Sequence, residues 1–327
     1  MTIPTITVLV PTYNRSAMLR NTLACMIAQE TDERFTFEIM VIDDVSTDDT
    51  VAVVREFIAA SPVPIRYILG KGRGITEVYN LAVEEFCGEW MAFFDDDQVT
   101  NSNCWLKDLY SAALEQGADM VGGPILLDLP ENILAGIGPV CRDLYGESPE
   151  VRHPERYTKT NPLPAGGNRL VRRRVFERIG GFDGSILTGG GDRDFLLRAK
   201  DAGVVMGWAS TAPGMHQIPP ERIQYKHVKW YSVQWGCSFA HIDRKRFGLV
   251  KTMLSAIARV VQTLLVHVPM LLWGWIRGDS KTILDRQALY WRTVGYVRRA
   301  LQLLAPKIFT QEKFFARVEF RRGRETT

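Results

Sequence analysis

Cysteine is scarce and scattered in this 327-residue chain. Its five cysteines are odd in number and form no CxxC pair, which excludes a disulfide framework and a zinc ribbon. The chain also lacks internal repeats and low-complexity segments, and 46% of its residues are hydrophobic against 24% charged. These proportions exclude a disordered, fibrous or polytopic membrane protein, and they predict a globular protein in a reducing compartment.

Long hydrophobic runs are also absent. The longest, Val260–Ile276, has 17 residues and is interrupted by Gln262 and Pro269, whereas a membrane-spanning helix needs about 20 apolar residues. The following segment, Thr282–Leu304, mixes leucine, valine and aromatic residues with arginine. Such a mixture predicts helices that lie in a membrane interface rather than cross it, although a pair of helices packed on the body or in a dimer has the same pattern.

The net charge of +3 hides a strong asymmetry. Residues 244–327 contain 17 Lys and Arg against five Asp and Glu, and the preceding residues contain 23 against 32. We therefore expect two domains, 1–245 and a basic helical region at 246–327 that associates with a membrane or mediates oligomerisation. Because Met1–Thr5 lacks the basic start of a signal peptide, we expect a cytoplasmic protein, peripheral on the inner face of the cell membrane.

Short apolar segments alternate with helical patterns over the first hundred residues. Segments rich in Val, Ile and Phe predict buried strands at Ile6–Val10, Phe37–Ile42, Ile65–Leu69 and Trp90–Phe94. The helical patterns between them are at Ala17–Gln29, Asp48–Ala60 and Thr76–Cys87. This alternation predicts an α/β, Rossmann-like fold, with a mostly parallel twisted sheet and helices on both faces, followed by C-terminal amphipathic helices.

The middle of the chain is less regular. A helix is predicted at about Cys104 to Gln116 and a strand at Met120–Val121, followed by loops around short elements up to Pro164. Beyond them the pattern predicts one more strand and two more helices, at Gly166–Val171, Arg173–Ile179 and Asp192–Ala202.

Polar residues follow each of the four predicted strands. They are Pro11 to Arg15, Asp43 to Ser46, Gly70 to Gly74, and Asp95 to Asp97. Because ligands of parallel α/β sheets bind beyond the carboxyl ends of the strands, these four segments are expected to converge on one rim.

The triplet Asp95-Asp96-Asp97 is the clearest candidate for chemistry. Three adjacent carboxylates repel one another unless a cation lies among them, and Mg²⁺ or Mn²⁺ prefers carboxylate and phosphate oxygens. A solvated acidic turn is the alternative. The five apolar residues that precede the triplet place it at the end of a buried strand and favour the metal site.

Two further strand ends carry candidate nucleotide contacts. Asp43 and Asp44 can accept hydrogen bonds from a base or from ribose hydroxyls, as carboxylates at strand ends do in Rossmann-type sites. The loop Gly70 to Gly74 bears Lys71 and Arg73 and suits the approach of a diphosphate. It is not a dinucleotide fingerprint, because Ile75 stands where GxGxxG needs glycine and the loop follows the third strand.

Taken together, these motifs resemble glycosyltransferase family 2. The resemblance rests on Val8 to Arg15, Asp43 to Asp48, Gly74 to Asn80, Gly88 to Asp97, and Gly180 to Asp183 followed by Asp192, all in the order of that family. It covers roughly residues 5 to 245 and implies the GT-A fold. His216 to Arg222 and Trp235 to Ser238 further resemble the family's bacterial rhamnosyl and other sugar transferases, which build surface polysaccharides or glycolipids.

The resemblance also implies roles for individual residues. Asp95 and Asp97 match the acids of the DxD motif that hold the metal, with His216 as an additional metal or diphosphate contact, and Asp192 matches the general base. The positions implied to bind the nucleotide-sugar donor are Pro11, Tyr13, Arg15, Asp43, Asp44, Lys71, Arg73, Asn80 and Asp96. Gly191 replaces the glutamate that usually precedes the base, which leaves Asp194 as a second candidate for that role.

The function that follows is an inverting, metal-dependent glycosyltransferase. It would move a hexosyl or deoxyhexosyl group from a UDP- or dTDP-sugar to a hydroxyl of a glycan or glycolipid acceptor, with Mg²⁺ or Mn²⁺ neutralising the leaving diphosphate. Two alternatives stay open: a sugar nucleotidylyltransferase, which would need a Gly-rich loop after the first strand, and a non-catalytic binding module whose basic tail contacts nucleic acid. We expect no nucleic-acid partner, while a homo-oligomer is compatible with the sequence.

Overall fold

The chain divides into two compact units. The computed structural model describes residues 4–148, 164, 166–186 and 190–309. The first, which we call the sheet unit, comprises Met1–Asp128, Gly146–Leu187 and Gly191–Gln217, and the second, the helical unit, comprises Leu129–Tyr145, Thr188–Gly190 and Ile218–Thr327. The domain boundary expected at residue 245 falls inside the helix α12 (Tyr225–Gln262), whereas the compact division comes after Gln217.

A seven-stranded sheet with the order β3-β2-β1-β4-β8-β6-β9 forms the centre of the sheet unit. Its strands are β1 (Ile6–Thr12), β2 (Phe37–Asp43), β3 (Ile65–Leu69), β4 (Trp90–Phe94), β6 (Met120–Gly122), β8 (Asn168–Arg172) and β9 (Met206–Trp208). The first four are parallel, and β8 is antiparallel to both of its neighbours. The register pairs Thr12 with Asp43 and Asp43 with Leu69, so the polar segments after β1, β2 and β3 begin at one edge.

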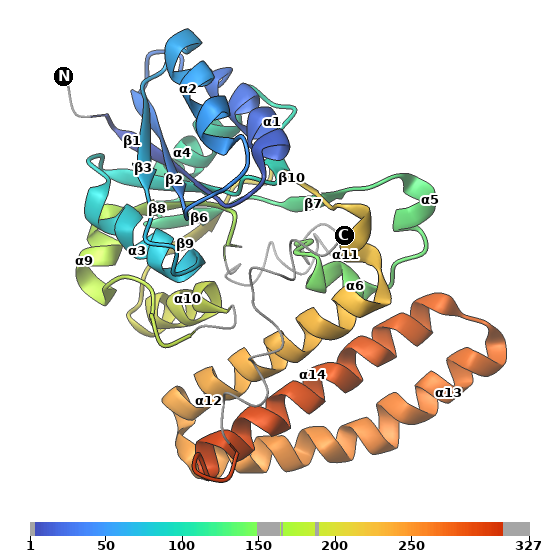
Figure 1. The fold of residues 1–327 in the computed structure, drawn as a ribbon. Coiled ribbons are helices and arrows are strands. Elements are labelled where there is room, and N and C mark those ends of the chain that lie inside the picture. Colours follow the sequence, from blue (N-terminus) through green and yellow to red (C-terminus); the bar gives the residue numbers. More distant parts are fainter. Residues whose placement is uncertain (1–3, 149–163, 165, 187–189, 310–327) are drawn as a thin grey trace. The chain divides into compact units, whose positions relative to one another are not determined.

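Helices cover both faces of this sheet (Figure 1). On one face lie α1 (Ser16–Ile27), α2 (Thr50–Ala60) and α4 (Trp105–Glu115); on the other lie α3 (Ile75–Glu85), α9 (Arg173–Ile179) and α10 (Gly191–Asp201). Because side chains alternate across a strand, successive residues of β1 and β4 enter opposite cores: Phe94 packs with α1 and α4, and Phe93 packs with α3, α9 and α10. The predicted α/β fold with helices on both faces is confirmed.

A small second sheet was not predicted from the sequence. It has the order β5-β10-β7, formed by β5 (Gln98–Val99), β7 (Ile125–Asp128) and β10 (Gly214–Gln217). Its register pairs His216 with Gln98, across an antiparallel ladder. This pairing brings His216 next to the acidic triplet that precedes β5.

The helical unit is built around two long helices. Its elements are α5 (Glu131–Leu134), α6 (Pro139–Leu144), α11 (Pro220–Ile223), α12, the π-helical turn η1 (Thr263–His267), α13 (Val268–Arg277) and α14 (Ser280–Leu304). The helices α12 and α14 pack closely along each other (Figure 1). A Cβ at Gly236 would lie 2.0 Å from the carbonyl oxygen of Arg292, and one at Gly295 would lie 2.1 Å from that of Val233, so only glycine allows this approach.

The short helix α6, which comes much earlier in the chain, packs against α14 through hydrogen bonds to Asp285. Both carboxylate oxygens of Asp285 on α14 accept hydrogen bonds from the first turn of α6, from the amides of Val140 at 3.1 Å and Cys141 at 3.0 Å. An acidic group at a helix N-terminus satisfies amides that have no partner within the helix. This contact holds α6 on the C-terminal helices, although the two are far apart in sequence.

The apolar run predicted in the tail, Val260–Ile276, lies in the second of two helical segments that meet at Gly248. Tyr225 to Arg277 continues through α12, η1 and α13, with a kink at Gly248, where φ is +81°, and with Pro269 in the first turn of α13. Within the described residues, this stretch is long and apolar enough to cross a membrane by length and composition alone. The final part of the basic region, 310–327, and most of the predicted loop after residue 148 lie outside the described residues.

Candidate active site

The acidic triplet lies at the carboxyl end of β4, as predicted. Asp96 and Asp97 are each 4% exposed, and Asp95 is partly buried. The Nη1 atom of Arg15, at the start of α1, lies 2.7 Å from Oδ1 of Asp96 and 2.6 Å from Oδ2 of Asp97. Burial disfavours the charged guanidinium, but the two carboxylates outweigh it and raise the pKa of Arg15.

Asp95 has a strongly raised pKa. Burial, together with the carboxylates of Asp97 and Asp192, raises its pKa to about 7. The hydroxyl of Tyr79 on α3 is 3.5 Å from Oδ1 of Asp95. The site therefore crowds several negative charges into a poorly hydrated space, where a cation is needed for all of them to ionise.

His216 joins this cluster from β10. Its Nε2 atom lies 3.3 Å from Oδ2 of Asp97, and the backbone amide of the next residue, Gln217, donates to the carbonyl oxygen of Asp97 at 2.8 Å. The sequence placed His216 with the metal-binding acids only through the family resemblance. The β5–β10 pairing supplies the physical reason for its position.

Asp192, at the start of α10, also faces the cluster. Its Oδ1 atom lies 2.9 Å from Nη2 of Arg169, a side chain with no exposed surface, whereas the Asp192 side chain is 37% exposed. The rival candidate Asp194 is buried, and its Oδ2 atom pairs with Nε of Arg198 at 2.7 Å. Of the two acids, Asp192 is the one that adjoins Asp95 electrostatically and remains accessible.

Glycine backbone lies between these two groups of acids. A Cβ at Gly167 would be 2.2 Å from Oδ2 of Asp95, and a Cβ at Gly166 would be 2.6 Å from Oδ2 of Asp192. Any larger residue at either position would displace an acidic side chain. The pair Gly166-Gly167 therefore lets the chain pass close to both carboxylates.

The acids after β2 are engaged by the protein itself. Asp43 accepts hydrogen bonds from the amide of Ser46 at 2.8 Å and from the hydroxyl of Tyr67 at 2.8 Å. Asp44 accepts from the amides of Arg73 at 3.1 Å and Gly74 at 2.8 Å, which fixes the Gly-rich loop at the start of α3. Base recognition by these two acids stays a prediction.

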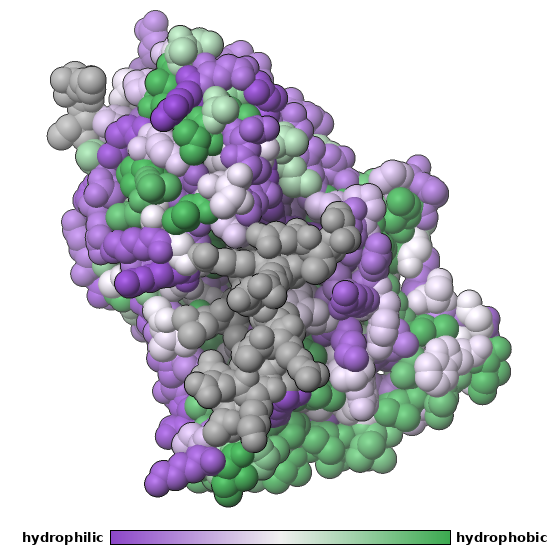
Figure 2. All heavy atoms as spheres, in the orientation of Figure 1, coloured by the Kyte–Doolittle hydropathy of each residue, from purple (hydrophilic) through white to green (hydrophobic). Residues whose placement is uncertain are grey.

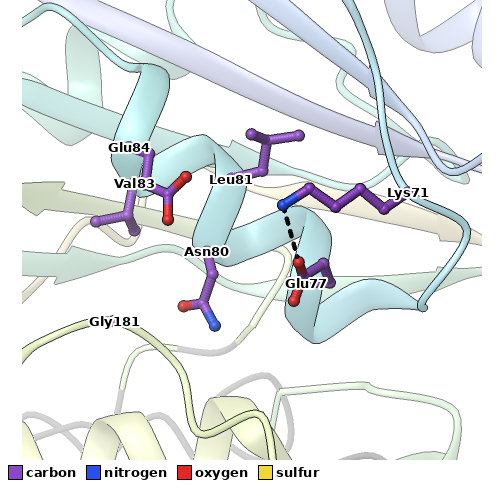
Figure 3. Close-up of a pocket in the computed structure, with 7 residues that line it drawn as sticks. All are labelled: Lys71, Glu77, Asn80, Leu81, Val83, Glu84 and Gly181. Carbon is purple, nitrogen blue, oxygen red and sulfur yellow. Dashed lines mark hydrogen bonds and ion pairs between the residues drawn. The ribbon is translucent and has the colours of Figure 1, made fainter.

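Lys71 and Asn80 line a separate pocket of about 260 Å³ (Figure 3). Lys71 lies 3.3 Å from Glu77, and Asn80 binds both backbone groups of Phe182, accepting from its amide at 2.7 Å and donating to its carbonyl at 2.9 Å. None of the acidic triplet lines this pocket. The contacts of Asn80 hold α3 against the segment after α9, and donor binding by Lys71, Arg73 and Asn80 is untested.

The remaining nucleotide candidates lie at the end of β1. Pro11 is a buried strand residue paired with Ile42, and Tyr13 follows the strand and is partly buried. Sequence reasoning missed two side chains of the site, Tyr79 and Arg169. Arg169 stands in a strand whose neighbours Leu170 and Val171 are apolar, and a cation within an apolar strand is the one sequence signal that could have drawn attention to it.

By chemical type, though not by their present geometry, the groups of the cluster suit a divalent cation. The carboxylates of Asp95 and Asp97 are ligands that Mg²⁺ and Mn²⁺ both accept, whereas the imidazole of His216 suits Mn²⁺ better than Mg²⁺. The raised pKa of Asp95, caused by burial and by the neighbouring carboxylates, shows a site where a cation would offset negative charge. In the part of the chain that the structure describes, no set of three or more His, Cys, Asp or Glu side chains has metal-binding geometry.

The fold is that of a solved sugar transferase. The mannosyltransferase PcManGT from Pyrobaculum calidifontis, determined in complex with GDP-Man and Mn²⁺, matches with a TM-score of 0.59 over 94% of this chain and 89% of its own, at 17% sequence identity. This similarity confirms the GT-A fold that the sequence motifs implied.

The sequence comparisons give the family. Glycosyltransferase AglE of Haloferax volcanii is 27% identical over 219 residues, 67% of this chain and 69% of AglE. The succinoglycan biosynthesis protein ExoM of Rhizobium meliloti is 28% identical, over 64% of this chain and 65% of ExoM. Chondroitin synthase of Escherichia coli is 25% identical over 66% of this chain. The matched part is only 35% of the synthase.

The model of glycosyl transferase family 2 matches residues 7–180. The chain belongs to glycosyl transferase family 2, and it is a glycosyltransferase. This result favours sugar transfer over the nucleotidylyltransferase and binding-module alternatives.

Proposed function

We propose that this protein is an inverting, metal-dependent glycosyltransferase that moves a hexosyl or deoxyhexosyl group from a nucleoside-diphosphate sugar to a hydroxyl of a lipid-linked or polysaccharide acceptor. The observation that carries the proposal is the convergence of Asp95, Asp97 and His216 with an accessible Asp192. PcManGT was solved with GDP-Man and Mn²⁺, which supports the donor class and the cation. The names of AglE, a glycosyltransferase, and ExoM, a succinoglycan biosynthesis protein, support transfer to a glycan.

Asp95, Asp97 and His216 would hold the cation, with Asp97 the strongest candidate for direct ligation. When bound, Mg²⁺ or Mn²⁺ neutralises the negative charge of the departing diphosphate. Arg15 lies against Asp96 and Asp97 and supplies a fixed positive charge on the same side of the site. Lys71 and Arg73, on the loop held by Asp44, are the further cations assigned to the diphosphate.

Asp192 acts as the general base. Its carboxylate accepts the proton of the acceptor hydroxyl as the new bond to the anomeric carbon forms, and the bond to the diphosphate oxygen breaks with its electron pair. Attack opposite the leaving group inverts the anomeric centre. Asp194 cannot take this role without losing its contact to Arg198, which also donates to the carbonyl oxygens of Ile179 and Gly181.

The remaining candidates bind the nucleotide. Pro11 lies near the end of the inner strand β1 and Tyr13 follows that strand. Asp43 ends the adjacent strand β2 and Asp44 follows it, at the edge where ligands of such sheets bind. As hydrogen-bond acceptors, these carboxylates are the proposed partners of a base N–H or a ribose hydroxyl. UDP and dTDP sugars are the proposed donors.

A donor screen tests the function directly. Purified protein is incubated with Mn²⁺ and UDP-, dTDP- or GDP-sugars, and donor binding is measured as a rise in Tm. Transfer to a glycan or glycolipid acceptor is followed in parallel by product analysis. Asp192→Asn should keep the donor-dependent rise and lose transfer by about 10² to 10⁴. Asp201→Asn, at the other end of the same helix and exposed, is the matched control and should transfer normally.

Full transfer by Asp192→Asn would refute the base assignment. Loss of transfer in Asp194→Asn, with Asp192→Asn active, would move the role to Asp194. No binding or transfer with any donor would refute the proposed function as a whole.

We also propose that the basic region 246–327 attaches the protein to the inner face of the cell membrane. Large apolar side chains along α12, η1 and α13 are exposed: Val250, Leu254, Ile257, Leu264, Leu265, Leu272, Trp273, Trp275 and Ile276. Figure 2 shows hydrophobic residues gathered along this stretch of the helical unit. An adjoining apolar groove of about 590 Å³, lined by residues of α12, η1 and α14, includes Leu264. Apolar surface beside arginines is typical of helices that lie in an anionic lipid interface.

A further inference from the structure

The sheet unit contains two arginine–aspartate pairs that differ in how the arginine is satisfied. Arg198 pairs with Asp194 and also donates to two backbone carbonyl oxygens, each at 2.6 Å, so its hydrogen-bonding groups are used within the core. Arg169 donates from Nη2 to Asp192 at 2.9 Å, and its Nε and Nη1 atoms have no hydrogen-bond partner among the residues that the structure describes. The second pair is not explained by core stability alone.

The surroundings of Arg169 are aromatic. Its guanidinium carbon lies 4.2 Å from the ring centroid of Phe93, 5.4 Å from that of Phe182 and 5.6 Å from that of Phe195. These rings exclude water and stack on the cation, which fixes the plane of the guanidinium. A charge buried in this way is tolerated only with an opposite charge beside it, and Asp192 provides that charge.

The same contact determines how Asp192 is presented. Its Oδ1 atom is held by Arg169 from the buried side, whereas its Oδ2 atom lies against Gly166, where a Cβ would be 2.6 Å away. The neighbouring Gly167 brings the backbone equally close to Asp95. One oxygen of the Asp192 carboxylate is therefore anchored by Arg169. The other points to the backbone of Gly166 and Gly167, which lies between Asp192 and Asp95.

We propose that Arg169 is the positioning residue for the catalytic carboxylate of Asp192. It keeps Asp192 oriented, with Oδ2 toward the acceptor, and it offsets the repulsion from Asp95. The inference rests on the proposed function. In the reaction the acceptor proton passes to Oδ2 of Asp192 while the electron pair of the broken bond leaves with the diphosphate, and Arg169 keeps its own proton throughout.

Two substitutions of Arg169 separate positioning from packing. Arg169→Met keeps a long apolar side chain against the three rings but removes the charge, and Arg169→Lys keeps the charge. Arg169→Met should lower kcat by about 10², with the KM for the donor within threefold of wild type. Arg169→Lys should recover at least tenfold of that loss. Arg172→Met, on the same strand with its side chain paired to Glu89 outside the site, is the matched control and should leave both constants unchanged.

A double variant tests whether Arg169 acts through Asp192. In the Asp192→Asn background, Arg169→Met should change kcat by less than threefold, because the group that it positions is already gone. Donor-dependent stabilisation shows whether each variant is folded, and Arg169→Gln replaces Arg169→Met if that protein does not fold. A folded Arg169→Met or Arg169→Gln protein with wild-type kcat, or equal losses in the Asp192→Asn background and in wild type, would overturn the proposal. An inactive wild type with every donor would instead refute the proposed function.

Discussion

The two compact units differ in which unfavourable feature they carry: buried charge in the sheet unit and exposed apolar surface in the helical unit. In the sheet unit several charged groups are buried and paired within the protein, as Arg15 is with Asp96 and Asp97, and Asp194 with Arg198. In the helical unit apolar side chains are left in contact with solvent, including Leu265 at 72% and Ile276 at 77% exposure. A folded protein keeps buried charge where chemistry requires it and exposed apolar surface where a partner covers it. The difference is the basis on which we propose catalysis for the first unit and attachment for the second.

The comparison is tested most strongly by removing one acid of the cluster. Asp97→Ala should lower transfer by at least about 10³, because the diphosphate then leaves without its neutralising cation. Mn²⁺-dependent donor binding should be lost as well. The measurement is transfer at saturating donor with a Mn²⁺ titration. Asp32→Ala, an exposed acid paired with Lys107, is the control; equal effects of the two changes would contradict a special role for the cluster.

Breaking the Asp194–Arg198 pair should lower the free energy of unfolding more than it lowers kcat. Asp194→Ala leaves the partly buried Arg198 guanidinium without its carboxylate, which should cost about 2 kcal/mol in the free energy of unfolding. Urea unfolding at pH 7 measures this loss. Below the unfolding transition, kcat should stay within about fivefold of wild type. A stable but inactive protein would show that Asp194 belongs to the reaction.

Charges placed on the apolar face of the helical unit should abolish lipid binding. Leu264→Glu with Leu265→Glu should reduce the fraction bound to anionic vesicles by about 30-fold, since two exposed leucines would no longer enter the interface. Cosedimentation with phosphatidylglycerol vesicles measures the bound fraction. Ile58→Glu, at a partly exposed apolar residue of the sheet unit, should not change it. Undiminished binding of the double variant would show that another surface attaches the protein.

The smallest effect is expected from the pH dependence of stability in metal-free protein. The raised pKa of Asp95 means that the folded state binds this proton more tightly than the unfolded chain, so the free energy of unfolding falls as pH rises from about 4 to about 7. Asp95→Asn removes this contribution and should make the protein about 1 to 3 kcal/mol more stable than wild type at pH 8, with little difference at pH 4. Urea unfolding in the presence of a chelator, at pH 4 and at pH 8, measures the difference in stability between Asp95→Asn and wild type. The same difference at both pH values would contradict the prediction.

The sequence predicted the part of the fold whose pattern is local. The strands at Ile6, Phe37, Ile65 and Trp90 begin where the structure has them, because each is a short, mostly apolar run rich in β-branched or aromatic residues. The sheet β5-β10-β7 was missed, because its strands have two to four residues and β10 pairs with segments about a hundred positions earlier. Such pairing leaves no periodicity to detect.

The residues of the candidate site likewise fall into those that the sequence predicted and those, such as Arg169, that it did not. Asp95 to Asp97 were predicted from their position after an apolar strand, and Asp192 and His216 came from the family motifs. Arg169 was missed because its partner lies 23 residues away and its three aromatic neighbours come from β4, α10 and the segment after α9. Only the three-dimensional structure brings these groups together.

The central claim is tested most directly by counting Mn²⁺ ions bound per chain. Titration calorimetry with the nucleoside diphosphate present should give one ion per wild-type chain and none at the same concentrations for Asp97→Ala, while Asp32→Ala behaves as wild type. One ion bound equally well by the Asp97→Ala chain, or none bound by wild type, would contradict the account.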